Sequence, residues 1–342
     1  MLVGVTGGTG FVGSHVVKAL IADGHRVRVV HRASSRLDAL AGMANKSLET
    51  VVADISDYNA LKRAFTGCEW VFHIAAVADY WRADVQRMMH INVDGTDTVL
   101  RASRDANVKR VIFTSSAAAI GLPDNPRQPS NENVPFNLPP EQFPYGYSKS
   151  LAEKVVQKAV ADGQDVVIVN PTVVMGAGDL NMISGTYLMQ VAQWGALVPR
   201  SSGGISVTDV RDVALSHVAA AKHGKSGERY ILTTANFPNS TWFKMLADAV
   251  DVPAPMIPVP NALLPLGARL MHHLQQLGIE TPVDSSQVRL GGRYVYFDGR
   301  KAWQQLHTPQ VSMQESLDAT VKWYCEHGML YKNQHENFTF HL

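Results

Sequence analysis

Cysteine is scarce in this chain, which has only two, Cys68 and Cys325, among 342 residues. Two distant cysteines do not make a disulfide framework, so we expect a reducing, cytoplasmic location. Neither cysteine forms a zinc-like spacing with the 13 histidines, and no metal site is predicted. The chain starts directly with MLVGVTGGTG, without a basic region leading into an apolar run, and this pattern predicts no signal peptide.

An excess of either charge is also missing. Lys and Arg number 31 against 30 Asp and Glu, and no local cluster of Lys and Arg stands out. We therefore expect neither nucleic acid nor a membrane as a partner. The longest apolar stretch, VPNALLPLGARLM at 259–271, is too short and too interrupted by proline to span a bilayer. The expected partner is a small molecule, with a homodimer left open.

Short apolar runs alternate with helical or polar stretches in the first half of the chain. The runs LVGVTG, RVRVVHR, LETVVADI, EWVFHIAA, RVIFTSS and DVVIVNPTVVMG read as strands. Such alternation is typical of a doubly wound α/β fold, in which helices cover both faces of a parallel sheet. Later, NMISGTYLMQVAQWGAL is expected to be a helix, and ISVTDVRDVALSHVAAAKHG a short strand running into another.

This pattern predicts a dinucleotide-binding domain over residues 1–173, to which residues 204–234 return. Residues 174–203 and 235–342 are expected to form a smaller substrate-binding region that packs on the sheet. The proline spacing in 252–265 rules out a long regular element there.

A glycine-rich turn joins the first expected strand to the first expected helix in VGVTGGTGFVGSHVVKAL. Gly8, Gly10 and Gly13 satisfy G-x-G-x-x-G, while Gly7, Gly10 and Gly13 satisfy G-x-x-G-x-x-G. Glycines let the backbone approach a pyrophosphate, and the N–H groups and dipole of the helix start favour its phosphates. We therefore predict a dinucleotide site. The expected contacts in this turn are Gly7, Gly10, Phe11 and Val12.

The end of the second expected strand, RVRVVHR, has no carboxylate for the ribose hydroxyls of NAD. Arg32 and Arg36 offer guanidinium groups to a 2′-phosphate, although two solvated surface arginines would give the same sequence. We therefore expect NADP(H), with NAD(H) as a further option. Asp54, followed by Ile55, ends the third expected strand. It either receives the adenine amino group or caps the helix of SDYNALKRAF.

Tyr145 and Lys149 in PYGYSKSLAEK lie one helical turn apart, so a phenol and an ammonium share one helix face. Alone, such a pair is common and fits an exposed helix start equally well. Its interpretation depends on the other motifs of the chain.

Taken together, the motifs resemble those of the extended short-chain dehydrogenase/reductases, the NAD-dependent epimerase/dehydratase family. TGGTGFVG, VFHIAA, INVDGT, VIFTSSAAAIG, YGYSK, NPTVVMGAGD and TDVRDVA follow the family's order and spacing over nearly the whole chain. The chain looks most like the dihydroflavonol-4-reductase-like branch, which includes bacterial hopanoid-associated sugar epimerase-type proteins. The resemblance implies a Rossmann fold and an NAD(P)-dependent oxidoreductase. Asn92 in INVDGT has a family counterpart, but a helix-bracing role explains it equally well.

The resemblance also implies catalytic roles. Tyr145 would protonate the carbonyl oxygen as hydride arrives, and Lys149 would lower the phenol pKa and hold the nicotinamide ribose. The active hydroxyl of the family precedes a glycine by five positions, so Gly121 points to Ser116, with Ser115 structural. The cofactor contacts implied in other segments are Ala75, Ala76, Pro171 and Thr172.

Reductases, epimerases and dehydratases share this family, so the substrate is a separate question. Nucleotide-sugar members usually carry an arginine for the diphosphate where this chain has Gly204 and Ile205. Arg200, Arg289 and Arg293 could substitute for it. Dehydratases place an Asp-Glu pair just after the active hydroxyl, where SAAAIG supplies alanines.

We therefore favour an NADPH-dependent reductase of hydrophobic aldehydes or ketones. A nucleotide-sugar epimerase is the alternative, and a non-catalytic NADP-binding redox sensor is a second one. An apolar wall fits a carbonyl substrate of modest size, although core packing explains the two methionines equally well. The expected wall residues are Tyr80, Trp81, Met175, Met182 and Tyr187.

Overall fold

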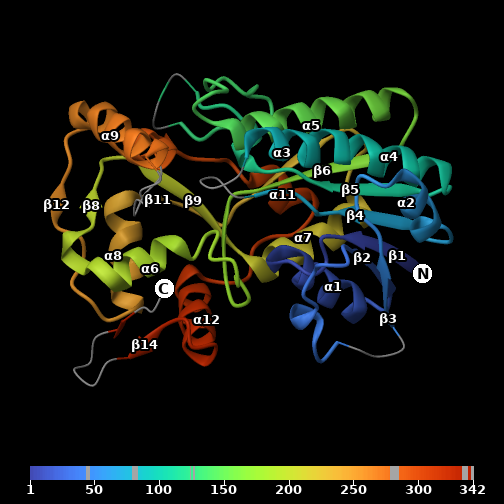
Figure 1. Ribbon diagram of the computed structural model, residues 1–342, viewed down its shortest axis with the longest axis horizontal. Coiled ribbons are helices and arrows are strands. Elements are labelled where there is room, and N and C mark those ends of the chain that lie inside the picture. Colours follow the sequence, from blue (N-terminus) through green and yellow to red (C-terminus); the bar gives the residue numbers. More distant parts are fainter. Residues whose placement is uncertain are drawn as a thin grey trace.

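Seven parallel strands form the central sheet, in the order β10-β6-β5-β4-β1-β2-β3 (Figure 1). The computed structural model describes residues 1–43, 47–78, 84–123, 125, 128–277, 285–332 and 338–339. The strands are β1 (Leu2–Thr6), β2 (Arg26–His31), β3 (Leu48–Val52), β4 (Trp70–His73), β5 (Arg110–Thr114), β6 (Val166–Pro171) and β10 (Arg229–Leu232). The strand order reverses between β1 and β4, as in a Rossmann sheet, and the predicted fold is confirmed.

Helices cover both faces of this sheet (Figure 1). One face carries α1 (Phe11–Ala22) and α7 (Val210–His223), and the other carries α2 (Tyr58–Phe65), α4 (Gly95–Asp105) and α5 (Pro144–Ala161). Helix α3 (Val85–Met89) and the π-helical turn η2 (His90–Asp94) lead into α4. Val3 and Val5 of β1 are fully buried on the side of α1, whereas Val71 and Val111 are buried on the side of α5. Burial on both faces explains why the strands are almost continuously apolar.

A smaller part of the molecule adjoins the carboxyl ends of these strands. Its four-stranded sheet contains β7 (Val173–Met175), β9 (Gly204–Asp209), β11 (Ala235–Pro238) and β13 (Tyr294–Val295). Its helices are α6 (Thr186–Trp194), α8 (Asn239–Ala249), α9 (Leu264–Gln276), α10 (Ser285–Gly291) and α12 (Met313–Glu326). Helix α11 (Arg300–Gln305) packs on the main sheet instead.

The remaining elements are short. They are the pairs β8 (Pro199–Arg200) with β12 (Ile257–Pro258) and β14 (Tyr331–Lys332) with β15 (Phe338–Thr339), and the 3-10 turns η1 (Asp38–Leu40), η3 (Ala117–Ala119), η4 (Gly195–Leu197) and η5 (Asn261–Leu263). Within the described part of the chain, none of the helices combines the length and apolarity needed to cross a bilayer.

Residues 204–234 divide between the two sheets. Strand β9 pairs within the smaller sheet, whereas α7 packs on α1 and β10 lies at the edge of the main sheet. The prediction of two consecutive strands here is wrong, because α7 directly follows β9. Asp209 starts this helix by accepting a hydrogen bond from the Arg211 backbone N–H, at 2.7 Å.

Candidate active site

The glycine turn between β1 and α1 forms one end of a large cavity. Gly7 has a φ of +73°, and a Cβ there would lie 2.5 Å from the Ala75 nitrogen. Position 7 must therefore be glycine, because any side chain would collide with the segment after β4. Gly10 borders the cavity at the start of α1, where no side chain caps the helix. The first N–H groups of α1 are thus available to a phosphate, and the turn fits a bound dinucleotide.

The cavity has a volume of about 970 Å³ and runs from this turn into the smaller part of the molecule. All predicted cofactor contacts border it. They are Gly7, Gly10, Phe11, Val12, Arg32, Arg36, Asp54, Ile55, Ala75, Ala76, Tyr145, Lys149, Pro171 and Thr172. Sequence reasoning thus identified residues that the fold brings to one continuous space.

The two arginines at the second strand end differ in their surroundings. The Arg36 guanidinium pairs with Asp38, with 2.7 Å between Nε and Oδ2, and both side chains are exposed. Arg32 forms no ion pair with any described residue, but its charge helps to lower the pKa of Asp54. Arg32 is therefore the better placed of the two for a phosphate on an adenine ribose.

Asp54 does not cap the following helix. The cap of α2 is Asp57, whose Oδ1 accepts from the Ala60 N–H at 2.9 Å. Asp54 Oδ1 instead accepts hydrogen bonds from the backbone N–H and the hydroxyl of Ser56, at 2.9 and 2.8 Å. The bond from the Ser56 backbone is the main reason that the pKa of Asp54 is lowered. This geometry leaves the role of Asp54 as an acceptor for the adenine amino group as the remaining prediction, since Asp54 borders the cavity and does not cap the helix.

Ser116, Tyr145 and Lys149 all border the cavity. Helix α5 begins with Pro144 at its first turn, and Tyr145 and Lys149 are 7% and 3% exposed. Ser116 follows β5 and caps the turn η3 by accepting from the Ala118 N–H at 3.2 Å. Its hydroxyl also hydrogen-bonds the Tyr145 phenol.

Burial favours the neutral forms of Tyr145 and Lys149, and it shifts the pKa of each accordingly. It raises the pKa of Tyr145 to about 12, although the hydrogen bond with Ser116 acts in the opposite direction, and the expected lowering of this pKa by Lys149 is not found. It lowers the pKa of Lys149 to about 8, although the negative charge of Glu153 acts in the opposite direction. The Lys149 ammonium donates to the Thr114 carbonyl at 2.9 Å and lies 5.3 Å from the centre of the Phe113 ring. At neutral pH the phenol is therefore protonated and the lysine is positively charged.

Glu153, one turn after Lys149, holds the strand ends beneath the site. Its Oε1 accepts from the Ser115 hydroxyl at 2.5 Å and from the Asn170 side chain at 2.6 Å, and Oε2 pairs with Arg229 at 3.2 Å. One carboxylate thus connects α5 to the carboxyl ends of β5 and β6 and to β10. Ser115 has the structural contacts expected of it. Sequence reasoning missed Glu153, although its i+4 spacing from Lys149 was a usable signal.

Asn92 braces the strand end on the other side of the site. It lies in η2 and is 2% exposed. Its side chain donates to the Val77 carbonyl at 3.0 Å, accepts from the Val77 N–H at 2.8 Å and donates to the Ser148 hydroxyl at 3.0 Å. These contacts support the bracing role, because they fix the segment after β4 against α5.

The far half of the cavity is mostly apolar, with a few uncharged polar side chains, namely Asn181, Ser184, Gln190, Ser201, Ser206 and Asn239. No Asp, Glu, Lys, Arg or His side chain of the described residues from 117 to 146 or from 173 onward borders it. Its wall includes Leu122, Leu138, Phe143, Ile183, Tyr187, Trp242, Phe243, Leu264, Met271, Val288 and Phe297. Arg200, Arg289 and Arg293 are not among the residues that border the cavity.

Three of the five predicted wall residues fall within the described part of the chain. Tyr187 borders the cavity, whereas Tyr80 and Trp81 lie outside the described residues. Met175 and Met182 do not border it, which corrects the expectation for both. Met175 is 1% exposed in the core between α6, α8 and α12, and Met182 packs against the same core.

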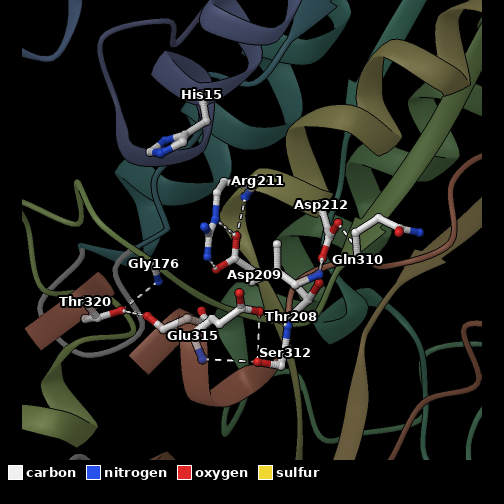
Figure 2. Close-up of polar contacts among 12 residues, drawn as sticks. His15, Gly176, Thr208, Asp209, Arg211, Asp212, Gln310, Ser312, Glu315 and Thr320 are labelled. Carbon is white, nitrogen blue, oxygen red and sulfur yellow. Dashed lines mark hydrogen bonds and ion pairs between the residues drawn. The ribbon is translucent and has the colours of Figure 1, made fainter. Parts of the chain in front are cut away.

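A polar cluster at the junction of β9 and α7 fastens the C-terminal helix to the sheet (Figure 2). Asp209 binds the Arg211 guanidinium through both oxygens, at 2.9 and 3.0 Å. Asp212 accepts from the backbone N–H groups of Gln310 and Val311, at 2.9 and 3.0 Å, and from His307 at 2.9 Å. Asp212 thereby holds the segment that leads into α12. The TDVRDVA motif contains both aspartates, but its sequence did not reveal this role.

Comparison with known proteins gives the site a context. A model of the NAD-dependent epimerase/dehydratase family matches residues 3–232. A dihydroflavonol 4-reductase-like protein of Synechocystis sp. is 35% identical over 335 residues, or 95% of this chain and 94% of that protein. Sterol demethylase protein B of Methylococcus capsulatus is 30% identical over 332 residues, or 95% of this chain and 99% of that protein.

Solved structures share the fold over almost the whole chain. The crystal structure of a nucleoside-diphosphate-sugar epimerase from Pseudomonas aeruginosa matches with a TM-score of 0.79 and 25% identity. The match covers 96% of this chain and 98% of that one. The chain is therefore similar both to a protein named as a reductase and to a protein named as a sugar epimerase.

Proposed function

This chain belongs to the NAD-dependent epimerase/dehydratase family and is an oxidoreductase with a nicotinamide cofactor, and we propose that it uses NADPH to reduce hydrophobic aldehydes or ketones. The observation that carries the proposal is the mostly apolar, uncharged half of the cavity beside Ser116 and Tyr145. An apolar wall with a few convergent polar groups suits a carbonyl compound whose single polar atom meets those groups. The names of the reductase-like relative and of the sterol demethylase protein agree with an apolar substrate.

In the proposed reaction, the hydroxyls of Ser116 and Tyr145 bind the substrate oxygen. A bound nicotinamide cofactor supplies the hydride. Tyr145 transfers its phenolic proton to the carbonyl oxygen, and the charge of Lys149 stabilises the phenolate that is left. The pKa of Tyr145 near 12 supports the role of donor, because the phenol is protonated throughout the neutral range. Asn92 and Glu153 do not touch the substrate in this proposal but hold the elements that position these groups.

NADPH is the proposed cofactor because of the charges at the second strand end. Arg32 borders the cavity, and no carboxylate follows β2 before Asp38, which is engaged with Arg36. A 2′-phosphate would gain a charge-assisted hydrogen bond from Arg32, whereas an NAD ribose would find no acidic partner there. Asp54, ionised and at the third strand end, is the proposed acceptor for the adenine amino group.

Epimerisation of a nucleotide sugar is the second candidate, supported by the match to the Pseudomonas aeruginosa structure. The far half of the cavity argues against it, since a diphosphate requires charged donors. An arginine at position 204 would not fit, because a Cβ on Gly204 would lie 2.5 Å from the Tyr296 ring. The chemistry of the wall therefore favours the reductase.

The test compares two ligand classes on the unmodified protein. We expect NADPH oxidation with an aromatic aldehyde or a cyclic ketone, and no heat of binding with UDP. Tyr187→Ala should lower kcat/KM for the aldehyde about tenfold or more, in the range for lost apolar pocket contacts. Trp194→Ala is the matched control, because Trp194 lies on the same helix, is 47% exposed and does not border the cavity. Tight UDP binding without carbonyl-dependent NADPH oxidation would overturn the proposal.

A further inference from the structure

One end of the molecule exposes a group of large apolar side chains, and we call it the apolar end. It consists of η4, β12 with the preceding Met256, η5, and α9 with the following Leu277, and α9 and β12 lie at the left of Figure 1. Ile257 pairs with Pro199, and the Met256 N–H donates to the Ala196 carbonyl, so β12 and η4 form one surface. Seven side chains there are 46% to 70% exposed: Leu197, Met256, Ile257, Leu263, Leu266, Leu270 and Leu277.

Helix α9 connects this surface with the cavity. Leu266 and Leu270 are exposed on α9 at helical spacing, and Leu263 of η5 and Leu277 after the helix end are exposed on either side of it. Other residues of the helix border the cavity: Leu264, Gly267 and Met271. Leu263 belongs to both groups, because it borders the cavity and is 53% exposed. Apolar surface is thus continuous from the exterior of the molecule to the proposed substrate site.

The apolar end also has a distinct charge. Residues 195–197, 256–258 and 261–277, which form it, contain no Asp or Glu. They contain Arg269 and the histidine pair at 272–273, and Arg200 of β8 pairs with Pro258 of β12. The expectation of no membrane partner rested on the balanced charge of the chain and on the lack of a Lys and Arg cluster, and it did not consider a surface that lacks acidic residues. An apolar surface with cations and without acids complements anionic lipid headgroups.

We propose that the apolar end docks on the surface of an anionic phospholipid bilayer and that the cavity receives a hydrophobic carbonyl compound from it. Helix α9 is too short to span a bilayer, and a helix with an exposed apolar side and cations can instead lie in the bilayer interface. A second copy of the chain fits this surface less well, because a symmetric contact would bring the cations of both copies together. The source of the substrate rests on the proposed reductase function, whereas the docking does not.

Co-sedimentation of the full chain with vesicles tests the docking without any turnover. Vesicles of phosphatidylcholine with phosphatidylglycerol should bind the protein more strongly than vesicles of phosphatidylcholine alone. The double variant Leu266→Glu/Leu270→Glu should bind the anionic vesicles at least tenfold more weakly. Neither leucine borders the cavity, so reduction of a water-soluble aldehyde should be unchanged. Leu215→Glu is the matched control, because Leu215 is 44% exposed on α7, away from the apolar end, and binding should be as in the wild type.

Three results would overturn the docking proposal. They are no binding of the wild type to anionic vesicles, equal binding by the double variant, and a dimer in sedimentation velocity that the double variant converts to monomer without any vesicle binding. If the double variant does not fold, Arg269→Gln decides, with an expected loss of about fivefold on anionic vesicles. Vesicle binding without aldehyde reduction would refute only the proposed function, and aldehyde reduction without vesicle binding would refute only the docking.

Discussion

Replacing Lys149 by methionine should abolish reduction and yet stabilise the fold at neutral pH. Lys149 is 3% exposed, and burial lowers its pKa from 10.5 to about 8. A lowered lysine pKa means that the folded protein binds fewer protons than the unfolded chain between pH 8 and 10.5. The charged lysine therefore costs stability in full below pH 8, and this cost decreases as the pH rises through that range.

The expected gain follows from this shift. At pH 7 the charge on Lys149 costs about 3 kcal/mol of unfolding free energy, since one pKa unit corresponds to about 1.4 kcal/mol. Methionine matches the length and removes the charge, but it leaves the Thr114 carbonyl without its donor, which costs about 1 kcal/mol. We expect Lys149→Met to be more stable than the wild type by about 2 kcal/mol at pH 7. At pH 10 the difference should be close to zero.

Urea unfolding of both proteins at pH 7 and pH 10, followed by fluorescence, measures the difference. Lys158→Met is the matched control on the same helix, because the Lys158 ammonium is exposed and pairs with Asp162 at 2.8 Å. It should leave the stability nearly unchanged at both pH values. A Lys149→Met protein that is less stable than the wild type at pH 7, or a difference that does not vary with pH, would refute this reasoning.

The other predictions concern turnover, cofactor choice and the C-terminal helix. Tyr145→Phe should lower kcat by about a hundredfold or more, as expected for a lost general acid, and leave NADPH affinity unchanged in a fluorescence titration. Tyr147→Phe should retain near-wild-type turnover, and equal losses in both variants would contradict the assignment. Arg32→Ala should weaken NADPH binding by about 1.5–3 kcal/mol and leave NADH binding unaffected, and tighter binding of NADH by the wild type would exclude the assignment. Asp212→Ala should lower the unfolding free energy by about 2 kcal/mol in urea, since His307 and two backbone N–H groups lose their acceptor, and an unchanged midpoint would disprove the anchoring role.

The sequence was most informative where local chemistry alone determines the structure. Continuously apolar strands indicate a sheet buried on both faces, and the turn after the first strand requires glycine. These two features together leave few possible folds. The choice of Ser116 over Ser115 also agrees with the contacts, because Ser115 is engaged with Glu153. The two strands predicted over ISVTDVRDVALSHVAAAKHG show the limit of this interpretation, because the valines at 207, 210 and 213 recur every three residues, a spacing that fits the helix starting after Asp209.

Features that depend on distant contacts could not be predicted. Met175 follows a strand end, as a wall residue would, but its side chain is turned toward α6 and α12 by the pairing of β7 with β9. The i+4 spacing of Glu153 from Lys149 was visible in the sequence, but its partners Ser115, Asn170 and Arg229 were not, because they lie on other elements.

The contacts of Glu153 have a consequence for how specificity can change in this protein. The carboxylate ties the helix of Tyr145 and Lys149 to strands of the main sheet, and none of these bonds involves a residue of the far cavity wall. Segments of the wall could therefore be exchanged or recombined between related enzymes while the reacting groups keep their geometry. Directed evolution toward a new ketone should find tolerated substitutions on α6, α8 and α9 and few on the inward face of α5.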